Sequence, residues 1–226
     1  MSQPPPVWDV SALRRPPRPR LTQPPPQFDA DYPGEQSRSA LFLRIVAFIP
    51  HYIIVTVFGY SVLLTTVIAW FAIVFTGAIP RGLFDFGALY LRWEARFFAY
   101  MCLLSDRYPP FGDAPYPAQF VIRCPERSAR LKTVFRAFLA IPSGIVLWLL
   151  AYVQAAAVVI AWFAILFTRR HPLGLYLFTL GWLRWTLRLQ AYLFLLTDHY
   201  PPFHLSETPD PAAPFLRMVE ASQAAV

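Results

Sequence analysis

The stretch "HYIIVTVFGYSVLLTTVIAWFAIVFT" at residues 51–76 contains no acidic or basic side chain apart from the histidine at its first position. It exceeds the roughly 20 apolar residues that an α-helix needs to cross a bilayer. A second stretch, "SGIVLWLLAYVQAAAVVIAWFAILFT" at residues 143–168, has the same length and carries no charge. The two stretches therefore predict a pair of transmembrane helices.

The composition of the whole chain agrees with a membrane protein. Its 226 residues are 56% hydrophobic and only 15% charged, with a mean hydropathy of +0.41. Soluble domains are usually about 25% charged. The net charge of +7 fits arginines in loops beside a bilayer, and no nucleic-acid recognition motif accompanies it. We therefore expect a membrane protein that does not bind nucleic acid.

The chain aligns with itself without a gap when it is shifted by 92 residues. The segment "RIVAFIP" (44–50) meets "RAFLAIP" (136–142), and "LLSDRYPPF" (103–111) meets "LLTDHYPPF" (195–203). About 31 of the 68 aligned pairs from Arg44 to Phe111 are identical. Such a fixed offset indicates a tandem duplication.

The repeat divides the chain into five segments. Residues 1–40 hold proline-rich, basic sequence such as "RRPPRPR" (14–20), which cannot bury enough apolar surface to fold alone. We expect an extended arm there, either disordered or docked on a partner protein or on anionic headgroups. The remaining segments are a first membrane hairpin (41–112), a cytoplasmic linker (113–127), a second membrane hairpin (128–205) and a C-terminal tail (206–226).

Each repeat is predicted to form a helical hairpin preceded by a short helix. Segments 39–50 and 128–142 carry basic side chains among apolar ones, which is typical of amphipathic helices in the headgroup region. Pro50 and Pro142 are expected to end or kink these helices. The second helices of the hairpins are expected at about 83–105 and 175–197. The predicted fold is an all-α integral membrane protein with four transmembrane helices, whose two halves are related by a pseudo-twofold axis along the membrane normal.

The basic residues that flank the predicted spans indicate an orientation. Eight of them lie on the side of the termini, and only Arg81, Arg169 and Arg170 lie in the opposite turns. Because basic residues concentrate in cytoplasmic loops, we expect both termini and both Tyr-Pro-Pro-Phe turns in the cytoplasm.

Four arginines lie near the middle of the predicted second helices: Arg92, Arg96, Arg184 and Arg188. A charge at mid-bilayer costs roughly 2.5–3.5 kcal/mol on insertion scales, so these side chains need a polar environment. Three interpretations remain open. The arginines pair with carboxylates or carbonyl groups of the fold, or they form a basic site for a lipid phosphate or another anion. In the third, the second helices lie obliquely at the interface and the arginines reach the headgroups.

An aspartate precedes each Tyr-Pro-Pro-Phe turn. Asp106 and Asp198 each end a predicted second helix, where an acid opposes the helix dipole and needs a nearby cation. We predict that Arg44 and Arg136 supply it, with the pairing within or between repeats left open. The turns themselves are predicted to be structural clamps, because two prolines stop a helix. They comprise Tyr108, Pro109, Pro110 and Phe111, and Tyr200, Pro201, Pro202 and Phe203.

No catalytic pattern is found in the sequence. The four histidines show no metal-ligand spacing, and neither a nucleophile elbow nor a P-loop occurs. We therefore expect no enzymatic activity, no metal and no cofactor. The leading hypothesis is an accessory or scaffolding subunit of a larger membrane assembly. Its partners would be membrane lipids and membrane proteins, the latter through residues 1–40. The alternative is a lipid- or anion-binding protein that uses the four arginines, with or without a transport role.

Several elements resemble an uncharacterised bacterial membrane family, domain of unknown function 4389. They are "IAWFAILFT", a following Pro-x-Gly-Leu, "LRW" and the ending "LLTDxYPPF", and the resemblance covers about 44–112 and 136–205. It implies a multi-pass protein of the bacterial inner membrane with one or two copies of this hairpin. It implies no established activity and no functional residue.

Overall fold

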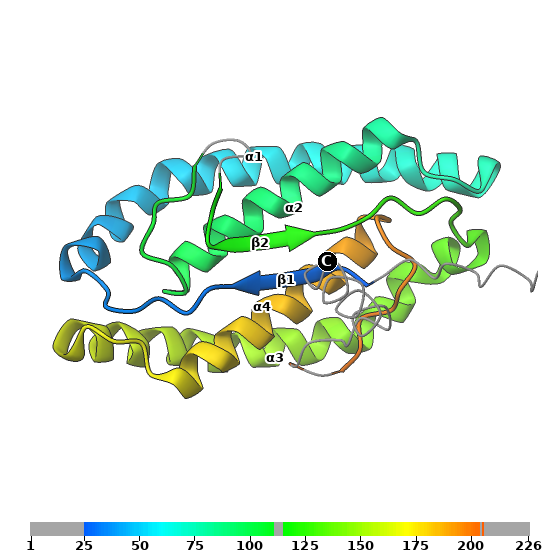
Figure 1. The fold of residues 1–226 in the computed structure, drawn as a ribbon. Helices are drawn as coiled ribbons and strands as arrows, with labels where there is room; N and C mark the ends of the chain where they lie inside the picture. Colours follow the sequence, from blue (N-terminus) through cyan, green and yellow to red (C-terminus); the bar gives the residue numbers. More distant parts are fainter. Residues whose placement is uncertain (1–24, 111–114, 204, 206–226) are drawn as a thin grey trace, which may run out of the picture.

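The computed structural model describes residues 25–110, 115–203 and 205. Along the chain, the elements are β1 (Gln27–Ala30), α1 (Arg38–Thr76), α2 (Arg81–Met101), β2 (Ala118–Val121), α3 (Arg130–Thr168) and α4 (Leu173–Leu193) (Figure 1). The order of one strand, one long helix and one shorter helix occurs twice. The predicted tail and the first 24 residues of the predicted arm lie outside the described residues.

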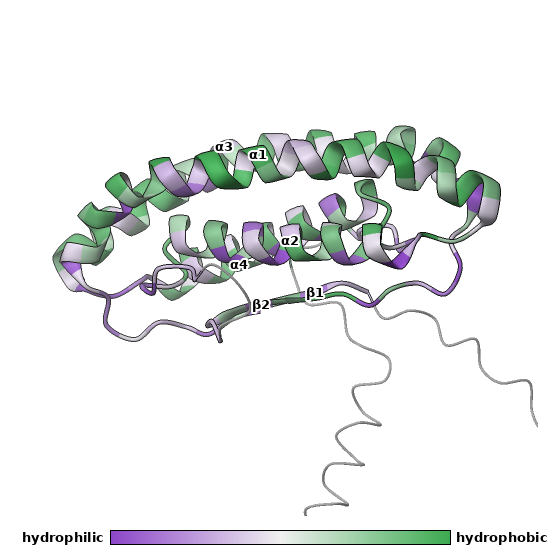
Figure 2. Ribbon diagram, turned by 90° about the horizontal axis from the view of Figure 1, so that it is seen from above, coloured by the Kyte–Doolittle hydropathy of each residue, from purple (hydrophilic) through white to green (hydrophobic). Residues whose placement is uncertain are grey.

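The elements form three layers (Figure 2). Helices α1 and α3 lie side by side in one outer layer, α2 and α4 form the middle layer, and the β1–β2 ribbon forms the other outer layer. The mostly helical character agrees with the prediction. The ribbon was not predicted, and it adds one strand to each repeat.

The long helices α1 and α3 are each continuous over 39 residues. The prediction of a separate interfacial helix before each span is wrong, because both helices run through Pro50 and Pro142. A proline removes only one backbone hydrogen bond from the helix interior. Six residues before each proline, Arg44 and Arg136 tie their helix to the end of a shorter helix. At 1.5 Å per residue, each helix is about 58 Å long.

The buried side chains of α1 and α3 follow a seven-residue period. In α1 they include Leu41, Val55, Val62 and Ala69. In α3 they include Thr133, Ala140, Leu147, Gln154 and Ala161. A strict seven-residue period keeps only a narrow stripe of a helix in contact with its neighbours. The rest of each helix surface therefore stays uncovered, although it is also apolar.

Helices α1 and α3 run antiparallel. The amide nitrogen of Gln36 donates to the carbonyl oxygen of Arg169 at 2.8 Å, and that of Ser128 donates to Gly77 at 2.9 Å. The two contacts are equivalent in the repeats, because 128 − 36 and 169 − 77 both equal 92. The start of each long helix thus lies beside the end of the other. The pseudo-twofold axis is therefore perpendicular to the long helices and passes through the three layers (Figures 1 and 2).

The ribbon lies on this axis. Phe28 of β1 is directly opposite Phe120 of β2, and the two positions are again separated by the repeat offset, 120 − 28 = 92. Three further identities precede the long helices at this offset: Pro25 with Pro117, Gln27 with Gln119, and Pro33 with Pro125. The duplicated unit therefore starts at the strand, earlier than the boundaries at 41 and 128 that we expected.

The middle layer contains the core between α2 and α4. Leu91, Ala95, Leu183 and Leu187 have no exposed surface. Both helices end four residues before the predicted ends, at Met101 and Leu193. The chain then turns at Leu103 and Leu195, which both adopt a φ of 65°. The same left-handed turn thus redirects the chain towards each Tyr-Pro-Pro-Phe segment.

Candidate membrane surface and its arginine clamps

One face of the molecule is a continuous layer of exposed apolar side chains from α1 and α3. Val46 is 71% exposed, Leu64 69% and Phe138 71%. No Asp, Glu, Lys or Arg occurs between residues 46 and 76 or between 137 and 168. Two helices about 58 Å long and about 10 Å wide present on the order of 1,000 Å², whereas the largest apolar patch on a soluble monomer is about 300–600 Å². We name this face the apolar layer.

Within the described residues, two helices are long and apolar enough to cross a membrane: Val46–Thr76 and Arg130–Thr168. Only 17% and 22% of their most apolar stretches are buried, whereas the core helix of a soluble protein is mostly buried. Helices α2 and α4, which we expected to be the other two spans, do not meet the same criterion. They carry the four arginines and lie between the apolar layer and the ribbon. The four predicted crossings are thus not seen.

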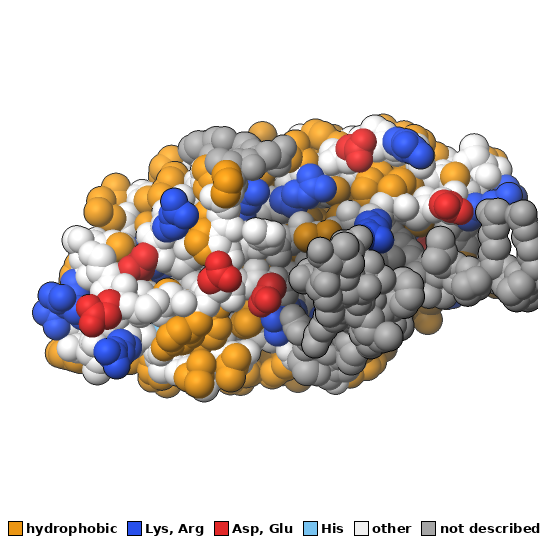
Figure 3. All heavy atoms as spheres, in the orientation of Figure 1, with side chains coloured by type: hydrophobic (Ala, Val, Ile, Leu, Met, Phe, Trp, Pro, Cys, Tyr) orange, Lys and Arg blue, Asp and Glu red, His pale blue; other side chains and the backbone are white. Residues whose placement is uncertain are grey.

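The ribbon face is the charged face of the molecule. Figure 3 shows Lys, Arg, Asp and Glu side chains spread over this side. In the edge-on view of Figure 2, the long helices are mostly hydrophobic, while the hydrophilic residues gather in the middle layer and around the ribbon. The molecule is therefore amphipathic as a whole, with opposite characters on its two outer layers.

Two of the four predicted anion-site arginines hold strand β1. The Arg184 Nη2 atom lies 2.7 Å from Asp29 Oδ1, and Arg184 Nε donates to the Phe28 carbonyl oxygen at 2.8 Å. Arg188 Nε donates to the Pro26 carbonyl oxygen at 3.4 Å. Arg184 and Arg188 thus pair with a carboxylate and carbonyl groups of the fold, as the first of the three interpretations predicts.

The first repeat differs at the equivalent position. Arg92 and Arg96 are half-buried on α2, and α2 packs against β2. The residue of β2 that corresponds to Asp29 is Val121. The counterpart of the Arg184–Asp29 ion pair therefore cannot form between Arg92 and β2. The structure therefore gives the four arginines unequal surroundings and does not present them as four equivalent members of one site.

Arg44 ties the start of α1 to the end of α2. Its Nη2 atom lies 2.6 Å from Asp106 Oδ1 and donates to the Ser105 carbonyl oxygen at 2.8 Å. Its Nη1 atom donates to the Tyr100 carbonyl oxygen at 2.6 Å, and the guanidinium lies 4.6 Å from the centre of the Tyr100 ring. The second oxygen of Asp106 accepts a hydrogen bond from the backbone nitrogen of Ser37 at 2.7 Å. We call this arrangement an arginine clamp.

The second repeat contains the same clamp. Arg136 forms an ion pair with Asp198 and donates to the carbonyl oxygens of Tyr192 at 2.8 Å and Thr197 at 3.0 Å. Asp198 Oδ2 accepts from the backbone nitrogen of Ala129 at 2.8 Å. The structure thus brings together the predicted arginine and aspartate partners, and each pair lies within one repeat.

Asp106 and Asp198 lie at different helix ends from those predicted. We expected each to end its second helix and to oppose that helix dipole, but α2 and α4 end earlier. Asp106 and Asp198 instead lie at the N-termini of α1 and α3, where a negative charge is stabilising. Ser37 and Ala129 begin these helices without a side-chain cap, so the distant carboxylates supply the missing hydrogen-bond acceptor.

The tyrosine of each Tyr-Pro-Pro-Phe turn contacts a long helix. Tyr108 Oη lies 3.2 Å from His51 Nδ1, and Tyr200 Oη lies 2.7 Å from Ser143 Oγ. His51 and Ser143 occupy equivalent positions in the two repeats, and each contacts the tyrosine of its turn.

The two prolines have the same burial in both turns. Pro109 and Pro201 are buried, whereas Pro110 and Pro202 are half-buried. The Phe203 ring packs at 5.7 Å from Trp185, and Phe111 lies outside the described residues. In the described residues, each turn therefore links the end of a shorter helix to a long helix.

A single carboxyl group is buried in the middle layer beside a glutamine. Glu94 is 5% exposed, and its Oε1 atom accepts a hydrogen bond from Gln190 Nε2 at 2.8 Å. Burial raises the pKa of Glu94 to about 7. Across the described residues, no group of three or more His, Cys, Asp or Glu side chains could hold a metal ion.

Together, the repeated hairpin and the apolar layer define a mostly helical protein with two helices that are long and apolar enough to cross a membrane. Two stretches match one family, described as Domain of unknown function (DUF4389), at residues 38–112 and 130–204. The chain therefore belongs to this family and contains two tandem copies of its domain, as the resemblance indicated. No curated protein and no solved structure matches the chain.

Proposed function

We propose that the protein is a non-enzymatic membrane protein. It anchors in a bilayer through the apolar layer and serves as an accessory or scaffolding subunit that offers its ribbon face to partner proteins. The observation that carries this proposal is the exposed apolar surface of α1 and α3, uncharged over residues 46–76 and 137–168, opposite a charged face. Burying on the order of 1,000 Å² of apolar surface contributes on the order of 25 kcal/mol. Lipid acyl chains supply such burial without any specific partner.

The buried charges support a structural role for the interior. Arg44, Arg136 and Arg184 each hold two elements together through carboxylates and carbonyl groups. These guanidinium groups therefore stabilise the fold. We place the protein in the bacterial inner membrane with its charged face and termini in the cytoplasm, as the resemblance and the basic residues suggest.

The second candidate function is binding of a lipid phosphate or another anion. Because Arg184 contacts β1 and Arg188 contacts Pro26 just before it, this candidate now rests on Arg92. The observation that favours it is Val121, which stands in β2 at the position where β1 has the Asp29 carboxylate. Loss of a co-purified phospholipid from an Arg92→Ala variant, with retention in Arg184→Ala, would support it.

The anchoring proposal is tested by membrane fractionation. Wild-type protein should stay in the membrane fraction after high-salt and alkaline washes, because its attachment is apolar. A Leu64→Glu/Ile160→Glu variant, with both changes at exposed positions of the apolar layer, should leave that fraction. The matched control is Gln119→Glu/Val121→Glu on the exposed side of β2, which should remain. Release of the wild type by salt alone would overturn the proposal.

The scaffolding part needs a separate test. Partners that cross-link to the wild type in membranes should be lost when the ribbon face is altered or when residues 1–24 are deleted. The deletion stops there because β1 and the start of α1 belong to the fold. Retention of all partners in both variants would contradict a scaffolding role while leaving membrane anchoring intact.

A further inference from the structure

We infer that the molecule lies on one side of the bilayer, with α1 and α3 parallel to the membrane plane and the apolar layer turned towards the lipid. Neither long helix then crosses the bilayer. This inference rests on the proposed membrane anchoring and specifies its geometry. It makes the pseudo-twofold axis parallel to the membrane normal. The occupant of the apolar layer is then the acyl-chain region of one leaflet, and both ends of the molecule face the same aqueous compartment.

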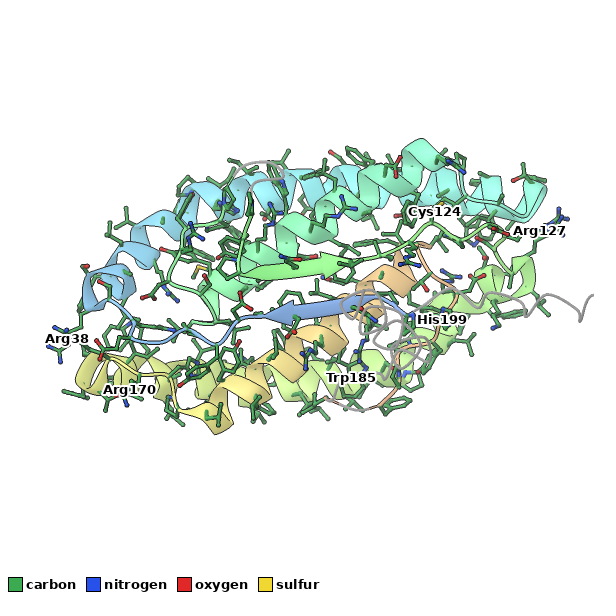
Figure 4. The ribbon with its side chains drawn as sticks, in the orientation of Figure 1. Arg38, Cys124, Arg127, Arg170, Trp185 and His199 are labelled. Atoms are coloured by element: carbon green, nitrogen blue, oxygen red, sulfur yellow. The ribbon has the colours of Figure 1, made fainter. Side chains whose placement is uncertain are left out.

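The basic residues at the two ends of the long helices give the first reason. One end carries Arg38, Arg169 and Arg170, and the other carries Arg127, Arg130 and Lys132. Figure 4 shows Arg38 and Arg170 at one end and Arg127 at the other. Because α1 and α3 are antiparallel, crossing helices would put these two groups on opposite sides. Basic residues concentrate on one side of a membrane, and a flat orientation places both groups there.

The ribbon gives the second reason. If the long helices crossed the bilayer, the middle of the ribbon face would lie at mid-membrane. A two-stranded ribbon has an open edge on each strand, and lipid-exposed sheet edges do not occur in the hydrocarbon region. The Asp29 side chain, which is 70% exposed, would also lie in lipid, where a charge costs roughly 2.5–3.5 kcal/mol on insertion scales. A flat orientation leaves the ribbon in water.

The length of the uncharged segments gives the third reason. Residues 137–168 contain no charge and extend about 48 Å as a helix. To fit a hydrocarbon core of about 30 Å, such a helix would need a tilt of about 50°. Transmembrane helices are tilted by about 20° on average and by at most about 40°. A helix that lies in the plane has no such limit on its length.

Cysteine labelling from each side of the membrane tests the inference. The native Cys124 is exposed, whereas Cys102 is buried. Cys124 reports on the Arg127 end, and an Arg170→Cys/Cys124→Ser variant reports on the other end (Figure 4). A membrane-impermeant maleimide, applied to right-side-out and to inverted vesicles, should label both reporters from the same side. Labelling of the two reporters from opposite sides would overturn the flat orientation. It is the result expected if two copies pack their ribbons together and their long helices cross the bilayer.

The same samples separate the inference from the function on which it rests. Protein that washes off the vesicles at alkaline pH contradicts membrane anchoring and the flat orientation together. Protein that resists the wash but shows opposite labelling contradicts the orientation alone. Resistance with same-side labelling supports both.

Immersion depth along α1 provides an independent measurement. Val46, Ile53, Tyr60 and Val67 are seven residues apart on one face, and all are at least half exposed. Nitroxide labels at these positions should show similar ratios of accessibility to oxygen and to a water-soluble nickel complex. In a crossing helix, the first and last labels would be about 32 Å apart along the axis. They would therefore be shallow while the middle pair is deep, and that profile would contradict the inference. A label at Gln119 supplies the water-exposed reference.

Discussion

Arg44 and Arg136 are each about 97% buried, and each guanidinium is neutralised by one aspartate while it binds two carbonyl oxygens. Breaking a buried ion pair typically costs about 3–5 kcal/mol, because the remaining charge stays uncompensated. The second oxygen of each aspartate also accepts a hydrogen bond from a backbone nitrogen at the N-terminus of a long helix. The clamp is therefore more than an ion pair, so we expect an exchange of its two charges to restore it only in part.

We predict that Asp106→Arg destabilises the protein and that the exchange Arg44→Asp/Asp106→Arg recovers less than half of the lost stability. The exchanged aspartate cannot donate to the carbonyl oxygens of Tyr100 and Ser105. The exchanged arginine cannot accept from the Ser37 nitrogen. Thermal unfolding in detergent measures both effects, with Arg127→Ala as an exposed control. Full recovery by the exchange would show that charge pairing alone accounts for the clamp.

Glu94 makes stability depend on pH. Its pKa is raised from the ordinary value of 4.5 to about 7, so the folded protein binds this proton more tightly than the unfolded chain. The corresponding stability is fully present below pH 4.5 and is lost as the pH rises to about 7. The total change is about 3 kcal/mol, because one pKa unit corresponds to about 1.4 kcal/mol.

We predict that Glu94→Gln flattens the fall in unfolding free energy between pH 4.5 and pH 7. The amide keeps an acceptor for Gln190 and does not ionise. Denaturant unfolding at several pH values compares the variant with the wild type and with the exposed-site control Glu126→Gln, which should retain the wild-type slope. An unchanged slope in Glu94→Gln would mean that other groups carry the pH dependence.

At the scale of elements, the contact of α1 with α2 depends on a small residue. A Cβ atom at Gly59 would lie 2.9 Å from the Tyr90 hydroxyl oxygen, whereas one at Gly144 would have no neighbour within 4 Å. In an open helix position, replacing glycine by alanine stabilises by about 1 kcal/mol. The two glycines therefore form a matched pair for testing how closely the layers pack.

We predict that Gly144→Ala raises the melting temperature and that Gly59→Ala fails to raise it, because the added methyl group displaces Tyr90. Parallel melting curves in the same detergent check the comparison. Equal stabilisation by the two changes would indicate that the first two layers are more loosely packed than the structure shows.

The sequence predicted the long apolar helices and the two arginine–aspartate pairs, because each depends on local composition or on a role that occurs twice. It did not predict the ribbon. Strands of four residues in proline-rich surroundings give little periodic signal. The identities of Pro25, Gln27 and Pro33 with residues of the second repeat were the available clue. The antiparallel packing of α1 and α3 could not be read from either helix alone, and it is what changes the expected membrane topology.

At the scale of the whole molecule, the duplication places two hairpins around an axis that is perpendicular to the long helices. This symmetry collects the apolar surfaces of α1 and α3 on one face and the ribbon on the other. A single hairpin would leave its strand without the antiparallel partner that the second copy supplies. Tandem duplication thus produces both the apolar layer and the polar face that opposes it.

The most direct test of the apolar layer is photo-cross-linking with a phospholipid that carries a diazirine in its acyl chain, followed by peptide mapping. Protein in such vesicles should be labelled along the exposed faces of α1 and α3, from Val46 to Phe75 and from Phe138 to Phe167. Helices α2 and α4 and the ribbon should remain unlabelled. Comparable labelling of the ribbon or of the second helices would contradict an apolar layer that alone faces the lipid.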